Sequence, residues 1–256
     1  MDYKVLITGG TGTLGRALTT ECLKHNLTPI ALSNDENQIY EMRKDFDIQC
    51  VLTDIREPIE VKCDYIIHAA ALKHVPICED NPIEAVKTNV LGSMNVLKMG
   101  KKCIAISTDK AVEPINTYGA TKFIMEQLFL NAGHPVVRFG NFWGSRGSVI
   151  PLWEEQAKEG YITITDLNMR RYWITPEDAA RFTLDHLNSQ RGVYIPKMRF
   201  MTLGELADEI APNAKRIIIG NRGNEKVEEI LEQKNNKEAS TIARRMRECL
   251  APSKCD

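Results

Sequence analysis

A tyrosine and a lysine four residues apart give this sequence its clearest chemical pattern. Tyr118 and Lys122 are separated by about one helical turn, which places them on one face of a helix. An ammonium beside a phenol favours the phenolate, so we expect Lys122 to lower the pKa of Tyr118. Tyr118 would then be a base for a sugar or alcohol hydroxyl. Taken alone, such a pair is usually part of an ordinary helix surface.

A second acid/base pair precedes this helix. Asp109 and Lys110 follow the apolar run at residues 104–106, which is typical of a buried strand, and Thr108 lies at the end of that strand. Proton transfer to and from a reacting sugar requires one acid and one base held close together. The sequence therefore predicts an active site at this strand end.

A glycine loop near the start of the chain supplies the context for these residues. It follows a β-rich run at residues 4–8 and precedes an amphipathic stretch at 16–25, the order that dinucleotide binding requires. The glycines permit a tight turn, backbone approach to a pyrophosphate and close helix packing. We predict a cofactor-binding loop that consists of Gly9, Thr11, Gly12, Thr13, Leu14 and Gly15.

The end of the second strand, at residues 28–33, should face the adenosine ribose. Ser33 and Asn34 are neutral and tolerate a 2′-phosphate, which favours NADP. Asp35 favours NAD instead, unless it caps the next helix, and no arginine stands there to hold a phosphate. We predict NADP, with NAD as the alternative.

Two further strand ends contribute candidates for binding. Asp54 could accept from the adenine amino group or simply belong to a turn, and Ile55 would contact the cofactor beside it. Lys73 and His74 could contact the substrate, although a lone histidine is more often structural. The small residues that would let a cofactor lie close to the backbone are Ala69, Ala70 and Ala71.

The alternation of strands and helices predicts an α/β fold, a Rossmann-type doubly wound parallel sheet with a small C-terminal substrate-binding lobe. We expect a dinucleotide-binding core at 1–140 and mainly the lobe at 141–256, with about 176–200 returning to the core. A Gly-, Ser- and Arg-rich loop at 141–151 suits a diphosphate. The charged, helix-like pattern at 228–250 indicates a solvated or packing helix rather than a site.

Composition excludes several classes of function. The 256 residues carry a net charge of −1, which gives no general attraction to nucleic acid or anionic membranes. No run approaches the roughly 18 apolar residues that span a bilayer, and no signal peptide precedes the first strand. The seven cysteines are scattered and odd in number, which indicates reduced thiols in a cytoplasmic protein. No Cys/His spacing suggests a metal site.

With these residues in view, the chain resembles the extended short-chain dehydrogenase/reductases. More narrowly, it resembles the inverting UDP-N-acetylglucosamine 4,6-dehydratases of the polysaccharide-biosynthesis group. The resemblance runs from about residue 4 to residue 229. Its most specific parts are Ala71-Leu72-Lys73-His74-Val75-Pro76, Ser107-Thr108-Asp109-Lys110-Ala111, Tyr118-Gly119-Ala120-Thr121-Lys122 and Ser145-Arg146-Gly147-Ser148-Val149. Related retaining enzymes are membrane-attached and carry Met at the position of Tyr118.

The resemblance implies a three-step reaction on a nucleotide sugar. Tyr118, helped by Lys122, takes the C4 hydroxyl proton while hydride moves to the nicotinamide, and Thr108 holds the C4 oxygen. Lys110 removes H5 and Asp109 protonates the leaving C6 hydroxyl. Hydride then returns to C6 and a proton to the opposite face of C5. The cofactor is regenerated each cycle and stays tightly bound.

The same resemblance implies a substrate site, with UDP-N-acetylglucosamine as the substrate. The chain departs from the family in lacking Pro-Gly within Arg222-Gly223-Asn224-Glu225-Lys226 and in having Asn34 where an arginine is usual. The implied substrate-binding residues are Lys73, His74, Asn141, Arg146, Ser148, Val149, Arg171, Arg222 and Glu225.

Other functions are compatible with the same scaffold. They are a nucleotide-sugar 4-epimerase, a dehydratase of another nucleotide sugar, and a non-catalytic dinucleotide-binding protein. Family analogy further implies a homo-oligomer that feeds the synthesis of pseudaminic acid or a related deoxy-sugar.

Overall fold

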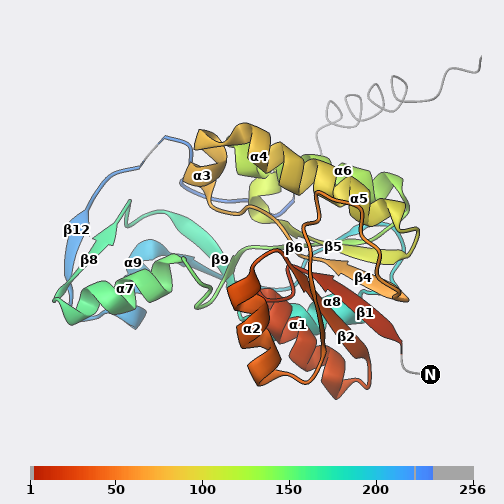
Figure 1. Ribbon diagram of the computed structural model, residues 1–256. Helices are drawn as coiled ribbons and strands as arrows, with labels where there is room; N and C mark the ends of the chain where they lie inside the picture. Colours follow the sequence, from red (N-terminus) through yellow and green to blue (C-terminus); the bar gives the residue numbers. More distant parts are fainter. Residues whose placement is uncertain (1–2, 222, 233–256) are drawn as a thin grey trace, which may run out of the picture.

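The computed structural model describes residues 3–221 and 223–232, so Arg222 and most of the predicted C-terminal helix lie outside the described residues. A seven-stranded sheet forms the centre of the molecule, with strand order β10-β6-β5-β4-β1-β2-β3 and every neighbouring pair parallel (Figure 1). This arrangement confirms the predicted Rossmann-type α/β fold. Its strands are β1 (Lys4–Thr8), β2 (Thr28–Ser33), β3 (Gln49–Leu52), β4 (Tyr65–His68), β5 (Lys102–Thr108), β6 (Val136–Phe139) and β10 (Val193–Tyr194).

Helices cover both faces of this sheet because its strands are apolar on both sides. On one face lie α1 (Thr13–Lys24), α2 (Glu36–Asp45) and α8 (Pro176–Asp185) (Figure 1). The opposite face carries α3 (Val75–Asp80), α4 (Pro82–Val86), α5 (Gly92–Lys98) and α6 (Thr117–Asn131). Ile7 faces the first group and Leu6 the second, and both side chains are fully buried.

A π-helical segment, η1 (Lys87–Leu91), lies between α4 and α5. Asn89 lies in this segment and is buried. Its Oδ1 accepts from the Leu72 N–H at 2.8 Å, and its Nδ2 donates to the Leu72 carbonyl and to the Thr121 hydroxyl, both at 3.0 Å. Asn89 therefore fastens the loop after β4 to α6, and π-helical segments of this kind are frequent near functional sites.

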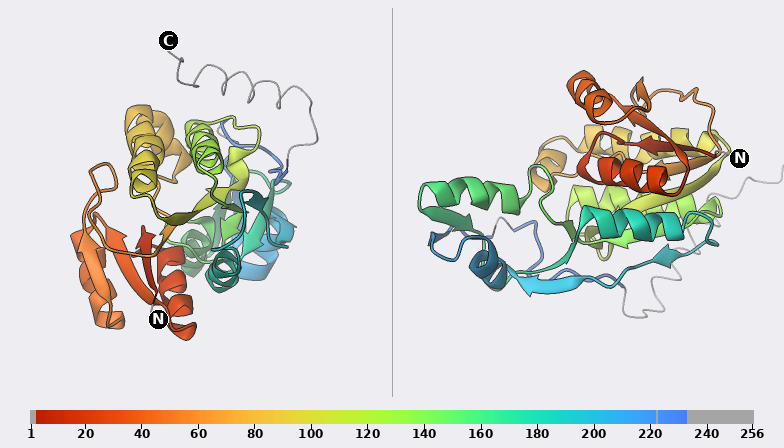
Figure 2. Two further views of the ribbon diagram at one scale, coloured as in Figure 1. Left: turned by 90° about the vertical axis from the view of Figure 1, so that its right-hand side faces the viewer. Right: turned by 90° about the horizontal axis from the view of Figure 1, so that it is seen from below.

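A smaller lobe lies beyond the carboxyl ends of the sheet strands (Figures 1 and 2). It has a core of its own, centred on the fully buried Trp153. The chain enters the lobe after β6, returns to the sheet for α8 and β10, and re-enters the lobe at β11. The elements of the lobe are β7 (Asn141–Phe142), α7 (Val149–Lys158), β8 (Tyr161–Ile164), β9 (Arg170–Ile174), β11 (Arg199–Thr202), α9 (Leu203–Ile210) and β12 (Lys215–Ile218). Among the described residues, no helix is long and apolar enough to cross a membrane.

Candidate functional site

The glycine loop between β1 and α1 has the geometry of a phosphate cradle. Gly9 has φ +67°, and a Cβ on it would lie 2.9 Å from Ala70 Cα. A Cβ on Gly15 would lie 2.4 Å from the Gly9 carbonyl oxygen. Gly12 precedes α1, whose first turn holds no acidic residue, so the first N–H groups of the helix are suited to an anion. The residues present therefore fit a dinucleotide.

Hydroxyl and amide groups line the end of β2 beside this loop. The buried Thr11 hydroxyl lies 3.0 Å from Ser33 Oγ and 3.1 Å from Gln38 Oε1. Asp35 is the N-cap of α2 and accepts from the Gln38 backbone N–H at 3.0 Å and from Gln38 Nε2 at 2.7 Å. These hydrogen bonds lower the pKa of Asp35. The carboxylate that could have favoured NAD is thus committed to capping a helix.

The predicted adenine-binding residues are also engaged with neighbours. Asp54 accepts from Arg56 at 2.7 Å and from Asn34 Nδ2 at 3.1 Å. The hydrogen bond from Arg56 holds the pKa of Asp54 below its usual range. Ile55 is buried, and a Cβ on Gly92 would lie 2.7 Å from its Cδ1. Contacts of Asp54 with adenine and of Ile55 with the cofactor stay predictions.

An acid/base cluster lies where β5 ends, in the 3-10 turn η2 (Asp109–Ala111). The fully buried Asp109 accepts at Oδ1 from the Thr108 hydroxyl at 2.9 Å and from Lys110 Nζ at 3.0 Å. Asn141 Oδ1, from β7 in the lobe, lies 3.5 Å from the same Nζ. Asp109 Oδ2 is buried without a hydrogen-bond partner among the described residues. A substrate hydroxyl would supply that missing partner.

A second buried carboxylate lies beside Lys110 and was missed by the sequence analysis. Glu229 is 2% exposed, with Oε1 3.7 Å from Lys110 Nζ and Oε2 3.5 Å from Lys226 Nζ. Burial alone would lower the pKa of Lys110, but Asp109 and Glu229 outweigh it and the pKa is raised. The expectation of a solvated or packing helix from residue 228 is wrong for Glu229. The only sequence signal was its position three residues after Lys226.

Tyr118 and Lys122 share α6, but Lys122 does not lower the pKa of Tyr118. Lys122 Nζ donates to the Ile106 carbonyl oxygen at 2.7 Å, and burial lowers its own pKa to about 8. Burial raises the pKa of Tyr118, partly opposed by a hydrogen bond with Thr108. The predicted shift is therefore wrong in direction, because a buried ammonium needs an acceptor and finds it on the β5 backbone.

Close packing brings α6 against the acid/base cluster. A Cβ on Gly119 would lie 2.2 Å from the Lys110 carbonyl oxygen, so only glycine allows this approach. Asn116 begins the helix by accepting from the Gly119 N–H at 2.8 Å. As a result Tyr118, next to Gly119, lies near Thr108.

The loop before α7 lies over the nucleotide loop. Arg146 Nη2 donates to the Thr11 carbonyl oxygen at 2.8 Å, and the Arg146 carbonyl oxygen accepts from Lys73 Nζ at 2.9 Å. A Cβ on Gly147 would lie 2.8 Å from His74 Cε1. Lys73, His74 and Arg146 are thus brought together, but Arg146 lies at the cofactor cradle.

Other predicted substrate residues lie on the lobe side. Arg171 is 5% exposed and donates to the Val227 carbonyl oxygen at 3.2 Å, with Glu225 Oε2 at 3.6 Å. Ser148 Oγ is buried without a hydrogen-bond partner among the described residues, and Val149 begins α7.

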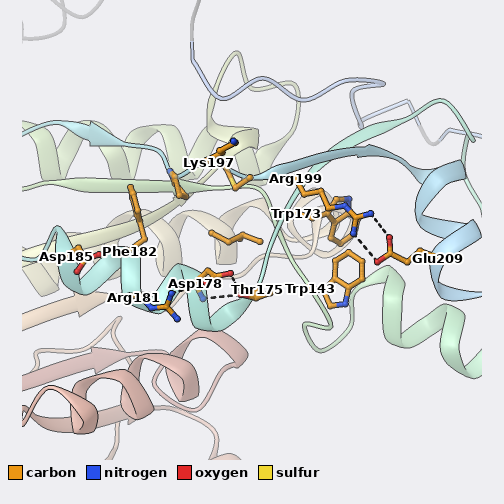
Figure 3. A pocket seen from close by; sticks show the side chains of 13 residues that line it. Trp143, Trp173, Thr175, Asp178, Arg181, Phe182, Asp185, Lys197, Arg199 and Glu209 are labelled. Carbon is orange, nitrogen blue, oxygen red and sulfur yellow. Dashed lines mark hydrogen bonds and ion pairs between the residues drawn. The ribbon is translucent and has the colours of Figure 1, made fainter.

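A cavity of about 670 Å³ lies elsewhere, between α8 and the lobe (Figure 3). Trp143, Phe182 and Arg199 are among the residues that line it, and no predicted site residue does. Its Arg199 is already paired with Glu209 at 2.7 Å. The cavity is therefore separate from the acid/base cluster.

Comparison with known proteins identifies what the whole chain is similar to. A family model described as polysaccharide biosynthesis protein matches residues 5–249. The chain is 41% identical to a UDP-N-acetylglucosamine 4,6-dehydratase (inverting) of Campylobacter jejuni, over 89% of this chain and 76% of that protein. It is 37% identical to a UDP-glucose 4-epimerase of Rickettsia massiliae, over 81% of this chain and 70% of that protein. The X-ray structure of Pen from Bacillus thuringiensis matches with a TM-score of 0.85 and 35% identity, over 91% and 84% of the two chains.

Proposed function

The chain belongs to the polysaccharide biosynthesis protein family, and we propose that it is a nucleotide-sugar 4,6-dehydratase. Its substrate is UDP-N-acetylglucosamine, and its product is a 4-keto-6-deoxy sugar nucleotide inverted at C5. The observation that carries this proposal is the Asp109–Lys110 pair at the end of β5, 3.0 Å apart, with Asp109 fully buried and Lys110 half-buried. The inverting dehydratase of Campylobacter jejuni supports it with 41% identity.

Loss of water from C5 and C6 needs a base for H5 and an acid for the leaving hydroxyl. One proton that moves from Lys110 Nζ to Asp109 Oδ1 converts this ion pair into an amine and a carboxylic acid. The Lys110 amine then takes H5, which a C4 carbonyl has made acidic. Asp109 gives its proton to the C6 hydroxyl, which leaves as water.

Oxidation at C4 requires removal of the hydroxyl proton, and we assign this step to Tyr118. The Thr108 hydroxyl would hold the C4 oxygen, and Lys122 supports α6 through its bond to β5. An oxidised nicotinamide cofactor, when bound, would accept the C4 hydride and return that hydride to C6, so the cofactor can stay tightly bound. We propose NADP as this cofactor, with NAD as the alternative.

For the nucleotide sugar we propose a binding surface on the lobe side of the cluster. The buried Ser148 hydroxyl and the buried Arg171 guanidinium are the polar groups that support this placement. Arg222 belongs to the same proposal, although it lies outside the described residues. The full set is Lys73, His74, Asn141, Ser148, Val149, Arg171, Arg222 and Glu225.

The second candidate is a nucleotide-sugar 4-epimerase, which the 37% identity to a UDP-glucose 4-epimerase favours. That reaction would use Tyr118 but has no need of the Asp109–Lys110 pair. Incubation with UDP-N-acetylglucosamine followed by mass spectrometry separates the two reactions. A dehydratase gives a product lighter by one water, and an epimerase gives a product of unchanged mass. No turnover would favour another nucleotide sugar or a non-catalytic dinucleotide-binding protein.

We further propose that the protein is a cytoplasmic homo-oligomer in pseudaminic-acid or related deoxy-sugar synthesis. Exposed apolar side chains on α4, η1 and α5 and on the adjacent α6 support self-association. They are Ile83, Val86, Leu91, Met94 and Ile124. Light scattering on Ile83→Glu tests the proposal, because a charge in this face should reduce the mass of the wild-type assembly to that of a monomer.

A further inference from the structure

The ribose end of the cofactor cradle holds no free acidic group from β2. Asp35 is committed to the start of α2 through two hydrogen bonds with Gln38. What faces the cradle instead is the pair of hydroxyls of Thr11 and Ser33, 3.0 Å apart and buried. Each of these hydroxyls can donate a hydrogen bond to a phosphate oxygen.

The guanidinium of Arg146, a residue distant in the sequence, lies beside Thr11 and Gln38. Arg146 Nη2 lies 2.7 Å from Gln38 Oε1 and 2.8 Å from the Thr11 carbonyl oxygen. The Arg146 backbone N–H donates to Thr13 Oγ1 at 3.3 Å. Among residues 3–221 and 223–232 no carboxylate lies within ion-pair distance of Arg146, whose direct contacts are neutral oxygens, although its charge helps to lower the pKa of Asp35.

Asp35 is hydrogen-bonded to Gln38, and two other charged groups around this place are paired. A small cavity of about 120 Å³ lies here, and Arg16, Glu41 and Arg146 are among its lining residues. Arg16 pairs with Asp45, and Glu41 pairs with Lys44 at 2.8 Å. Arg146 is therefore the cation of this cavity best placed for an incoming anion.

We propose that Arg146 binds the 2′-phosphate of NADP, together with the Thr11 and Ser33 hydroxyls. This inference rests on the proposed use of a nicotinamide cofactor and names the residue that selects NADP. The phosphate takes the place of Gln38 Oε1 as acceptor, and a guanidinium–phosphate contact is stronger than one to a neutral amide. The arginine expected at Asn34 is thus replaced by one that comes from the loop before α7.

This placement joins cofactor selection to the substrate side of the site. The loop that carries Arg146 also accepts from Lys73 and packs Gly147 against His74. A phosphate held by Arg146 would therefore fix the position of the residues that lead into α7.

The test is calorimetric titration of the full-length protein, freed of bound nucleotide, with NADP⁺, NAD⁺ and 2′,5′-ADP. The variants are Arg146→Gln and Arg146→Lys. Arg181→Gln is the control, because Arg181 is exposed on α8 and, within the part of the chain that the structure describes, pairs only with Asp178 of its own helix. Arg146→Gln should weaken NADP⁺ and 2′,5′-ADP binding by about ten- to a hundred-fold and leave NAD⁺ binding unchanged. Arg146→Lys should recover part of the loss.

Three results would overturn the inference. They are equal losses for NADP⁺ and NAD⁺, no loss of NADP⁺ affinity, and a wild-type protein that binds NAD⁺ at least as tightly as NADP⁺. None of these measurements uses a nucleotide sugar. A protein that binds NADP⁺ through Arg146 yet removes no water would contradict the proposed dehydratase and leave this inference standing.

Discussion

Lys110 Nζ lies 3.0 Å from Asp109 Oδ1, and the other oxygen of that carboxylate is buried without a partner among the described residues. Here the 3-10 turn after β5 aims both side chains toward the lobe side, where Asn141 and Glu229 meet Lys110. The pair is thus held for proton transfer at one end of the sheet.

Replacement of Lys110 by alanine separates the two halves of the reaction. Loss of a positioned base should reduce dehydration by about a hundred- to ten-thousand-fold. Oxidation at C4 uses Tyr118, so nicotinamide reduction on sugar addition should persist. Absorbance and product analysis measure the two steps, with exposed Lys98→Ala as the control. A Lys110→Ala protein that forms product at the normal rate would remove Lys110 from the mechanism.

The second carboxylate, Glu229, should influence the pH at which the Asp109–Lys110 pair loses its shared proton. Asp109 and Glu229 raise the pKa of Lys110, whereas burial and Arg171 lower it. Glu229→Gln removes one raising charge, and Lys226, left unpaired, lowers the pKa further. The falling limb of the pH–rate profile, where the pair loses the proton that Asp109 must donate, should therefore move to lower pH.

Glu228→Gln is the matched control, because Glu228 is exposed. A merely structural role for Glu229 would reduce the rate equally at every pH. A limb that moves to higher pH would contradict the assignment of Lys110 as the base.

Lys122 should make stability depend on pH. Burial lowers its pKa to about 8 in the folded protein, below its model-compound value of 10.5. Between these values the unfolded chain binds more protons, so stability rises with pH. Relative to Lys122→Met, the wild type should gain about 1 kcal/mol of unfolding free energy per pH unit between about pH 8 and 10. Denaturant unfolding at several pH values measures this difference, and a wild type that loses stability relative to Lys122→Met as the pH rises would contradict it.

Gly119 should tolerate no side chain. A Cβ there would meet the Lys110 carbonyl oxygen at 2.2 Å, so Gly119→Ala must push α6 from the cluster. We expect a loss of about 1–3 kcal/mol in unfolding free energy, with loss of activity. Gly192→Ala is the control, since its Cβ would lie 3.4 Å from its nearest neighbour. Equal stability of the two variants in thermal unfolding would contradict the packing described.

The parts of the site that the sequence predicted are local ones. The glycine loop and the Thr108–Lys110 segment are set by neighbouring residues and by the strand–helix order, so spacing alone located them. The pKa of Tyr118 was predicted wrongly, because helical spacing does not show that Lys122 reaches the Ile106 carbonyl. Glu229 and Arg146 depend on contacts with Lys110 and Gln38, more than 100 residues away in each case. Periodicity carries no information on such contacts.

The most direct test of the proposed dehydratase is proton NMR of the protein with UDP-N-acetylglucosamine in D2O. The account predicts a new C6 methyl signal, with deuterium at C5 in the inverted configuration. Interconversion of gluco and galacto forms without a methyl signal would contradict it and establish an epimerase instead.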